Sequence, residues 1–302
     1  MNDPMTKHFK TYVAVLFFAV LLLHISCANE KRSAVDVDNH IDFDTISVVE
    51  RHHLGGDTDN PYCEIRISFV FPVSSENLSI DTLQRIFVEN VFGTTLRELS
   101  PTDAVQRFVQ AHIESYLTAA QIFSERSTVL LPNVQLSEFS RHEEYLQSDT
   151  FFSLYESLEN EITFNQHGII AFQVKRSVQR GDFLAFDSFR NVVIDLRAGE
   201  PITEDDIFHE GFEMVLQRLI IASLLDKHNV QTIDQLEELG FFGIDEIMPN
   251  GNFLLDNRGI TYTFNKGEYS VDQIAAPVVF VPWRSVRTHL IRGGVGARLA
   301  EL

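Results

Sequence analysis

Cysteine is scarce in this sequence. Its 302 residues include only Cys27 and Cys63, so no intramolecular disulfide can form if Cys27 is modified at a membrane. Cys63 stands in phase with the apolar residues of an expected strand, which favours a buried thiol over a nucleophile. The protein must therefore rely on its core, and 44% hydrophobic residues suffice for one large domain or two interlocked ones.

Positive charge is also scarce. Lys and Arg number 24 against 43 Asp and Glu, which gives a formal net charge of −19. Losing Lys7, Lys10 and Asp3 with a signal peptide would leave −20. This charge opposes binding to nucleic acid or anionic lipid headgroups, because neutralising phosphates requires clusters of Lys and Arg. It suits a cationic partner, although solubility alone also explains an acidic surface.

Motifs for catalysis, metal binding and nucleotide binding are missing as well. The sequence has no G-x-S-x-G nucleophile elbow and no H-E-x-x-H zinc motif. His52 and His53 would point to opposite faces of a strand and could not share one ion. The loop at 57–60 lacks the continuing alternation of a calcium site, and the glycines at 293–296 follow a helix instead of a strand. We therefore predict no catalytic residue, no cofactor and no metal.

The longest apolar run lies at the N-terminus. Two lysines and a histidine precede an apolar stretch over 12–23. This pattern is typical of a secretory signal peptide and is too short for a comfortable transmembrane helix of about 20 residues. We predict a signal peptide over 1–26, with translation starting at Met1 or Met5.

The run ends at a candidate lipidation site. Ser26 before Cys27 fits a bacterial lipobox, whereas His24 departs from it. We predict that Cys27 is lipidated and that 27–42 is a polar tether, because two or more acyl chains hold a protein at a membrane without crossing it. An ordinary cleaved secretory signal and a short uncleaved anchor are the alternatives.

The first half of the mature chain predicts a hairpin followed by helices. Residues 44–53 and 63–72 alternate between apolar and polar side chains, and Pro72 is expected to end the second strand. Helices are predicted over 79–93 and, from an N-cap at Ser100, over 100–123. These elements make a smaller α+β companion domain over 43–148.

In the second half of the chain, apolar residues recur at every second position, as in β-strands. Three antiparallel strands are expected between 150 and 196, with turns at 165–168 and 179–182, followed by helices, two further strands near 252–266 and 276–283, and a closing helix at 284–291. The fold class is therefore α+β, with mostly antiparallel sheets, packed helices and two closely associated subdomains. The second subdomain spans 149–292, and 293–302 is expected to be a frayed tail.

Several segments resemble a known family. Residues 192–208 (VVIDLRAGEPITEDDIF), 252–270 (NFLLDNRGITYTFNKGEYS) and 276–286 (APVVFVPWRSV) are similar to the RsiV-like extracellular domain, a domain of unknown function. The segment 67–72 (ISFVFP) and the helices after it are similar to the smaller domain that usually precedes it. The resemblance covers about 45–292.

Two departures limit what the resemblance implies. The family often has a Gly-Gly-Ala-His segment where this chain has 181–184, so Leu184 stands in place of the histidine. The chain also lacks a cytoplasmic sigma-binding segment, so anti-sigma activity is not carried over. The outward role of the family, binding a lysozyme-type protein, is the part that the resemblance implies here.

Together these features predict a non-catalytic lipoprotein of the bacterial cell envelope. It would bind a lysozyme-like protein or an envelope glycan, and stand-alone members of the family suggest the outer membrane, facing the periplasm or the cell surface. An enzyme that modifies glycan or peptidoglycan is one alternative, because related modules accompany deacetylases. A structural subunit of an envelope assembly is the other.

Overall fold

A computed structural model describes residues 39–76, 78–130 and 152–301. They lie in a compact unit from Asp38 to Leu302 that contains its own hydrophobic cores. The predicted signal peptide, Cys27 and most of the tether fall outside the described residues. Among the helices that are described, none combines the length and the apolar character needed to cross a bilayer.

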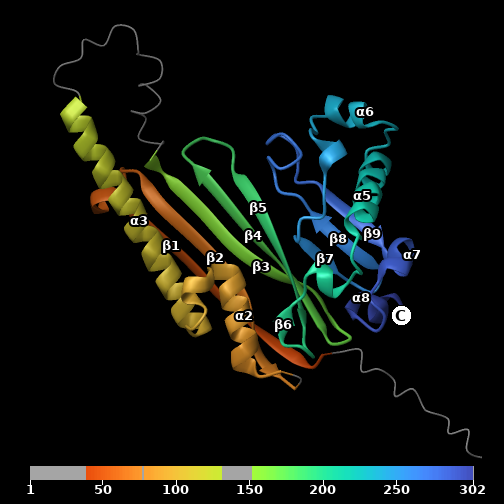
Figure 1. Cartoon of the computed structure of the whole chain (residues 1–302). Helices are drawn as coiled ribbons and strands as arrows, with labels where there is room; N and C mark the ends of the chain where they lie inside the picture. Colours follow the sequence, from red (N-terminus) through yellow and green to blue (C-terminus); the bar gives the residue numbers. More distant parts are fainter. Residues whose placement is uncertain (1–38, 77, 131–151, 302) are drawn as a thin grey trace, which may run out of the picture. The chain divides into compact units, whose positions relative to one another are not determined.

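Six strands form the larger sheet, in the order β1-β2-β3-β4-β5-β6 (Figure 1). They are β1 (Ile41–His53), β2 (Tyr62–Ser75), β3 (Leu154–Gln166), β4 (Ile169–Arg180), β5 (Phe186–Asp195) and β6 (Glu200–Pro201). Strand β2 pairs with β3 in parallel, and every other neighbouring pair is antiparallel. The sheet therefore joins strands from both predicted subdomains, whose boundary at 148 lies outside the described residues.

The predicted hairpin is confirmed, but its second strand is longer than expected. Strand β2 passes through Pro72 and continues to Ser75. A bulge accommodates the proline: Asp42 pairs with Ser74 and Phe43 with Pro72, which leaves Val73 without a partner. Proline is tolerated at bulges because the ladder of hydrogen bonds is already interrupted there.

Two helices cover one face of this sheet, α2 (Ile80–Phe92) and α3 (Pro101–Leu130). The predicted N-cap at Ser100 is confirmed, because the Asp103 amide donates to the Ser100 hydroxyl at 3.2 Å. Gly93 follows α2 with φ of 99° and ends that helix. The rings of Phe87 and Phe172 stack at 4.3 Å between α2 and β4. This contact lies in the core on the helical face.

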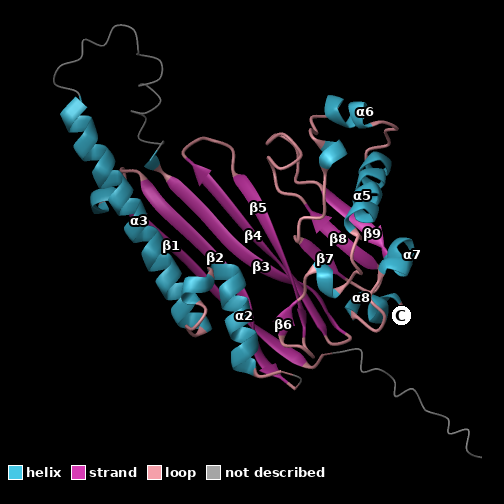
Figure 2. Ribbon diagram, viewed as in Figure 1, coloured by secondary structure: helices cyan, strands magenta, loops and turns pink. Residues whose placement is uncertain are grey.

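The C-terminal elements cover the other face (Figure 2). Helices α5 (Glu213–Lys227), α6 (Ile233–Glu238), α7 (Trp283–Val286) and α8 (Val295–Ala300) surround a three-stranded antiparallel sheet of β7 (Phe253–Leu255), β8 (Gly259–Thr263) and β9 (Val278–Pro282). Residues 252–266 therefore form a hairpin where the sequence predicted one strand. The turn closes where the Asp256 amide donates to the Gly259 carbonyl at 3.1 Å.

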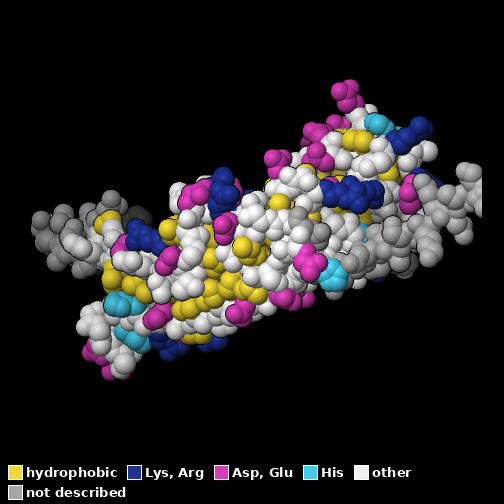
Figure 3. Space-filling view, turned by 90° about the horizontal axis from the view of Figure 1, so that it is seen from below, with side chains coloured by type: hydrophobic (Ala, Val, Ile, Leu, Met, Phe, Trp, Pro, Cys, Tyr) yellow, Lys and Arg dark blue, Asp and Glu magenta, His cyan; other side chains and the backbone are white. Residues whose placement is uncertain are grey.

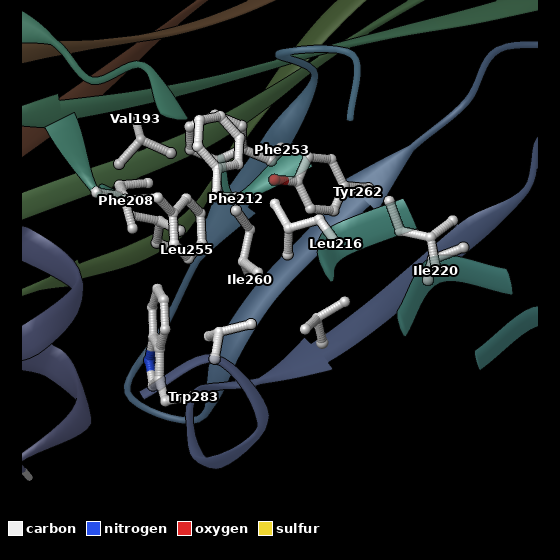
Figure 4. Packing of buried hydrophobic residues seen from close by; sticks show 14 of the residues in the cluster. Val193, Phe208, Phe212, Leu216, Ile220, Phe253, Leu255, Ile260, Tyr262 and Trp283 are labelled. Carbon is white, nitrogen blue, oxygen red and sulfur yellow. The ribbon is translucent and has the colours of Figure 1, made fainter. Parts of the chain in front are cut away.

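A second core lies between the two sheets (Figure 4). Val193 of β5 packs there with aromatic residues of the C-terminal part, and the Trp283 indole donates to the Asp256 carbonyl at 2.9 Å. Residues 169–172 of β4 and 192–194 of β5 are consequently buried on both faces, which explains the apolar run in each of these segments.

The predicted frayed tail is wrong. Helix α8 occupies these residues, and its Val295 and Leu299 are buried. A Cβ at Gly296 would lie 2.8 Å from Ile207 and 2.9 Å from Leu290. The glycine therefore permits close packing of α8, a role that its position after a helix did not reveal.

Candidate binding sites

Cys63, His53 and Leu184, which the sequence singled out, lie within the described residues. Cys63 is fully buried, as predicted, and burial, with a smaller effect of the Glu156 charge, raises the pKa of its thiol to about 11. His53 Nδ1 lies 3.0 Å from the Asn60 carbonyl, within the β1–β2 hairpin. Leu184 is 87% exposed. Within 39–76, 78–130 and 152–301, no group of three His, Cys, Asp or Glu side chains could hold a metal ion.

A buried ionic cluster that the sequence does not predict ties α3 to the sheet. Glu156 on β3 is 1% exposed; His112 Nε2 lies 2.5 Å from one of its oxygens, and Arg176 Nε donates to the other at 2.7 Å. Burial alone raises the pKa of Glu156, but the hydrogen bonds and charges of His112 and Arg176 outweigh burial and lower it. The carboxylate is thus paired and covered, which is a structural role.

Strand β5 pairs with β6 over only a short stretch. Along the rest of its outer edge, the side-chain amides of asparagines form hydrogen bonds with the β5 backbone. The Phe189 amide donates to Asn265 Oδ1 at 2.7 Å, and Asn265 Nδ2 donates back to the Phe189 carbonyl at 3.1 Å. The Asn191 amide likewise donates to Asn252 Oδ1 at 2.7 Å. These amides replace a neighbouring strand and fix the smaller sheet against the larger one.

A groove of about 770 Å³ follows this junction. The rings of Phe189 and Tyr269 line it together with Arg190, Glu268 and Asn90. Because the asparagines in its walls are already hydrogen-bonded to backbone, the groove is preformed. Open polar and apolar walls of this kind suit an extended ligand with hydroxyl groups and C–H faces better than a small apolar molecule.

The carboxylate of Glu204 supports the loop that forms one wall of the groove. Glu204 Oε1 accepts the Gly251 amide at 2.8 Å, and burial raises the pKa of Glu204. The Tyr262 hydroxyl lies between Phe212 and Phe253 in Figure 4 and has no hydrogen-bond partner among the described residues. Burial, and secondarily the charge of Glu204, raise the pKa of Tyr262. Glu204 therefore holds the loop that forms one wall of the groove.

A second candidate surface combines exposed carboxylates with exposed apolar side chains. Between Lys227 and Arg258 the chain has no Lys or Arg. Five exposed carboxylates lie in α6 and the turn after it: Asp234, Glu237, Glu238, Asp245 and Glu246. Leu239, Phe242 and Val271 are 50%, 43% and 41% exposed. We call these eight residues the acidic surface.

Backbone hydrogen bonds hold the apolar residues of the acidic surface together. The Val271 amide donates to the Gly240 carbonyl at 3.1 Å, and the Phe242 amide donates to the Tyr269 carbonyl at 3.1 Å. On the face seen in Figure 3, both acidic and basic side chains occur among hydrophobic ones. The acidic surface differs from such a mixed face because the chain has no Lys or Arg between Lys227 and Arg258.

Comparison with solved structures identifies the fold. A DUF3298 family protein from Bacteroides fragilis matches with a TM-score of 0.75 and 22% sequence identity, over 88% of this chain and all of that one. The chain has the DUF3298 fold. A DUF3298 family protein from Pseudomonas aeruginosa matches with a TM-score of 0.51 and 11% identity, over 83% of this chain and 95% of that one. No family model and no curated protein matches the sequence.

These likenesses confirm the predicted α+β fold class, and both neighbours are bacterial proteins of a family described as a domain of unknown function. At 22% and 11% sequence identity, the structural likeness shows only that the fold is shared. They do not test the RsiV-like specificity, the lipidation of Cys27 or the ligand, which remain predictions.

Proposed function

We propose that this protein is a non-catalytic lipoprotein of the bacterial cell envelope that binds a cationic, lysozyme-like protein through the acidic surface. Lipidation of Cys27 would place it at the outer membrane. The observation that carries the proposal is the presence of five exposed carboxylates and three exposed apolar side chains in the acidic surface.

This arrangement has the anatomy of a protein interface. An apolar centre supplies affinity when it is buried, whereas charged residues at the rim steer an oppositely charged partner and exclude others. A patch of carboxylates alone would need no exposed phenylalanine or leucine. Phe242 and Leu239 therefore favour recognition of a protein over simple solubility.

The test uses residues 28–302, which contain the whole compact unit, titrated calorimetrically with lysozyme at low and moderate salt. We expect saturable binding that weakens as salt rises. The double substitution Glu237→Gln/Glu238→Gln should weaken binding about tenfold at low salt, mainly through slower association. The matched control Glu161→Gln/Glu200→Gln removes two exposed charges outside the acidic surface and should change binding little.

Absence of binding at either salt would contradict the proposal, as would equal losses in the two double variants. Phe242→Ser separates the two contributions. It should weaken binding at both salt concentrations, because an apolar contact is not screened.

An envelope glycan is the second candidate ligand, and the groove at the edge of β5 favours it. Phe189 and Tyr269 could contact the C–H faces of sugar rings, while Arg190 and Glu268 could hydrogen-bond to hydroxyls. Soluble peptidoglycan fragments are the probe. Binding that Tyr269→Ala removes and Glu237→Gln/Glu238→Gln retains would assign the glycan to the groove.

A further inference from the structure

The charge of this acidic protein is segregated along the chain. Residues 273–300 contain four arginines and one histidine but no Asp or Glu, although carboxylates outnumber basic residues 43 to 24 overall. The net charge therefore does not describe the potential close to this segment. At physiological salt, charges more than about 8 Å apart are largely screened from one another, so local groups dominate.

The fold bends this segment around a hollow. After α7 and a turn of 3-10 helix (Arg287–His289), Leu290 bridges to Phe208, and the His209 amide donates to the His289 carbonyl at 2.9 Å. The chain then turns at Gly293, with φ of 74°, into α8. In Figure 1 these elements lie together at the C-terminal end.

The resulting cavity, which we call the basic hollow, has a volume of about 330 Å³. The apolar part of its lining consists of Leu290, Ala297 and Ala300. The polar part consists of His209, Arg287, Thr288, Arg292 and Glu301. Both arginines are exposed, so their guanidinium groups can reorient towards a ligand. Among the residues that the structure describes, Glu301 is the single carboxylate of the lining.

The two arginines are available for a ligand. Arg298 is already paired with Asp195 at 2.9 Å. Each of Arg66, Arg176 and Arg258 likewise forms an ion pair with a carboxylate. Arg287 and Arg292, by contrast, have no carboxylate within 4.0 Å in the part of the chain that the structure describes.

We propose that the basic hollow binds a phosphate group carried on a small polyol, either a sugar or the glycerol of a lipid headgroup. Planar guanidinium groups match the paired oxygens of phosphate, and the Thr288 hydroxyl and the His209 imidazole offer further hydrogen bonds. The alanines and Leu290 offer a surface for the C–H groups of the polyol. The volume of the hollow admits such a group and no more than a short extension of it.

The experiment titrates residues 28–302 with glycerol 3-phosphate and glucose 6-phosphate, with glycerol and glucose as unphosphorylated controls. A parallel arm measures cosedimentation with phosphatidylcholine vesicles that contain or lack phosphatidic acid. The variant Arg287→Gln/Arg292→Gln should weaken binding roughly tenfold or more, because hydrogen bonds to charged groups are the strong ones. Arg218→Gln on α5 removes an exposed charge outside the hollow and is the matched control.

Glu301→Gln provides the decisive gain of function. Removing the one carboxylate of the lining should strengthen phosphate binding severalfold, because a like charge beside an anionic ligand is removed. A loss of binding in this variant would contradict the proposal. The substitution leaves both arginines in place and changes an exposed side chain, so it is not expected to disturb the fold.

The two arms also identify the source of the phosphate. Saturation with glucose 6-phosphate, dependent on Arg287 and Arg292, supports a phosphorylated sugar. Arginine-dependent binding of glycerol 3-phosphate and of phosphatidic acid vesicles supports a lipid headgroup. Binding in neither arm, or binding that Arg287→Gln/Arg292→Gln retains, overturns the proposal. Lysozyme binding at the acidic surface is a separate property, and neither result affects it.

Discussion

Replacing Glu156 by glutamine would remove a buried charge while keeping the shape of the side chain. At neutral pH the variant should be destabilised by about 2–3 kcal/mol, because His112 and Arg176 lose an ionised partner. The value is below the ~3–5 kcal/mol typical of a broken buried pair, since the Arg176 side chain is half exposed and can be rehydrated. Urea unfolding at pH 7, followed by circular dichroism, measures it.

The pH dependence gives this prediction a second test. The pKa of Glu156 is lower in the folded protein than its ordinary value of 4.5. Such a group stabilises the fold above the unfolded pKa, and this stabilisation is lost as the pH falls through the folded pKa. The wild type and Glu156→Gln should therefore converge in stability below pH 4.5.

The control for both measurements is Glu161→Gln, an exposed change on the same strand, which should leave stability within about 0.5 kcal/mol. Equal unfolding midpoints for the wild type and Glu156→Gln at pH 7 would refute the stabilising role of the cluster. So would a difference that is the same at low and neutral pH.

Four further substitutions or probes test other parts of the fold. Gly296→Ala should destabilise the protein by about 1–3 kcal/mol in urea, because its Cβ would lie 2.8 Å from Ile207. Cys63 should resist a thiol reagent at pH 8 until urea unfolds the protein, since its pKa is raised to about 11; rapid labelling of the folded protein would contradict its burial. Asn252→Ala should cost about 1–3 kcal/mol and speed hydrogen exchange of the Asn191 amide, which would lose its acceptor. The pKa of Glu204 is raised, so its contribution to stability is present below 4.5 and is lost as the pH rises through its folded value; Glu204→Gln should remove this decline, and an unchanged pH profile would count against it.

The sequence predicted the elements whose signals are local. Alternation along 44–53 and 63–72 gave the first hairpin, and Ser100 followed by Pro101 marked the start of α3. The fold class follows from the same periodicities. Local patterns suffice in these cases because a turn, a cap and one buried face determine each element.

Features that depend on distant partners were not predictable. The short strands β7 and β8 were read as one, since each is only a few residues long and the Asp256–Gly259 turn carries no Asn-Gly or Asp-Gly signal. Nothing near Glu156 in the sequence indicates His112, which lies 44 residues earlier on a helix. The same limit applies to the basic hollow, because His209 and Arg287 are 78 residues apart in the sequence and are brought together by the backbone pairing of Phe208 with Leu290.

The total charge of the chain and the local charge of its surfaces point to different ligands. The total of −19 suggested a cationic partner and opposed an anionic ligand. In the fold, a stretch without Lys or Arg presents the acidic surface, and a later stretch without Asp or Glu encloses the basic hollow. If both proposals hold, rising salt weakens both interactions, so salt dependence alone cannot tell them apart. The substitutions can: Glu237→Gln/Glu238→Gln should affect only the protein partner, whereas Glu301→Gln should strengthen only the binding of phosphate.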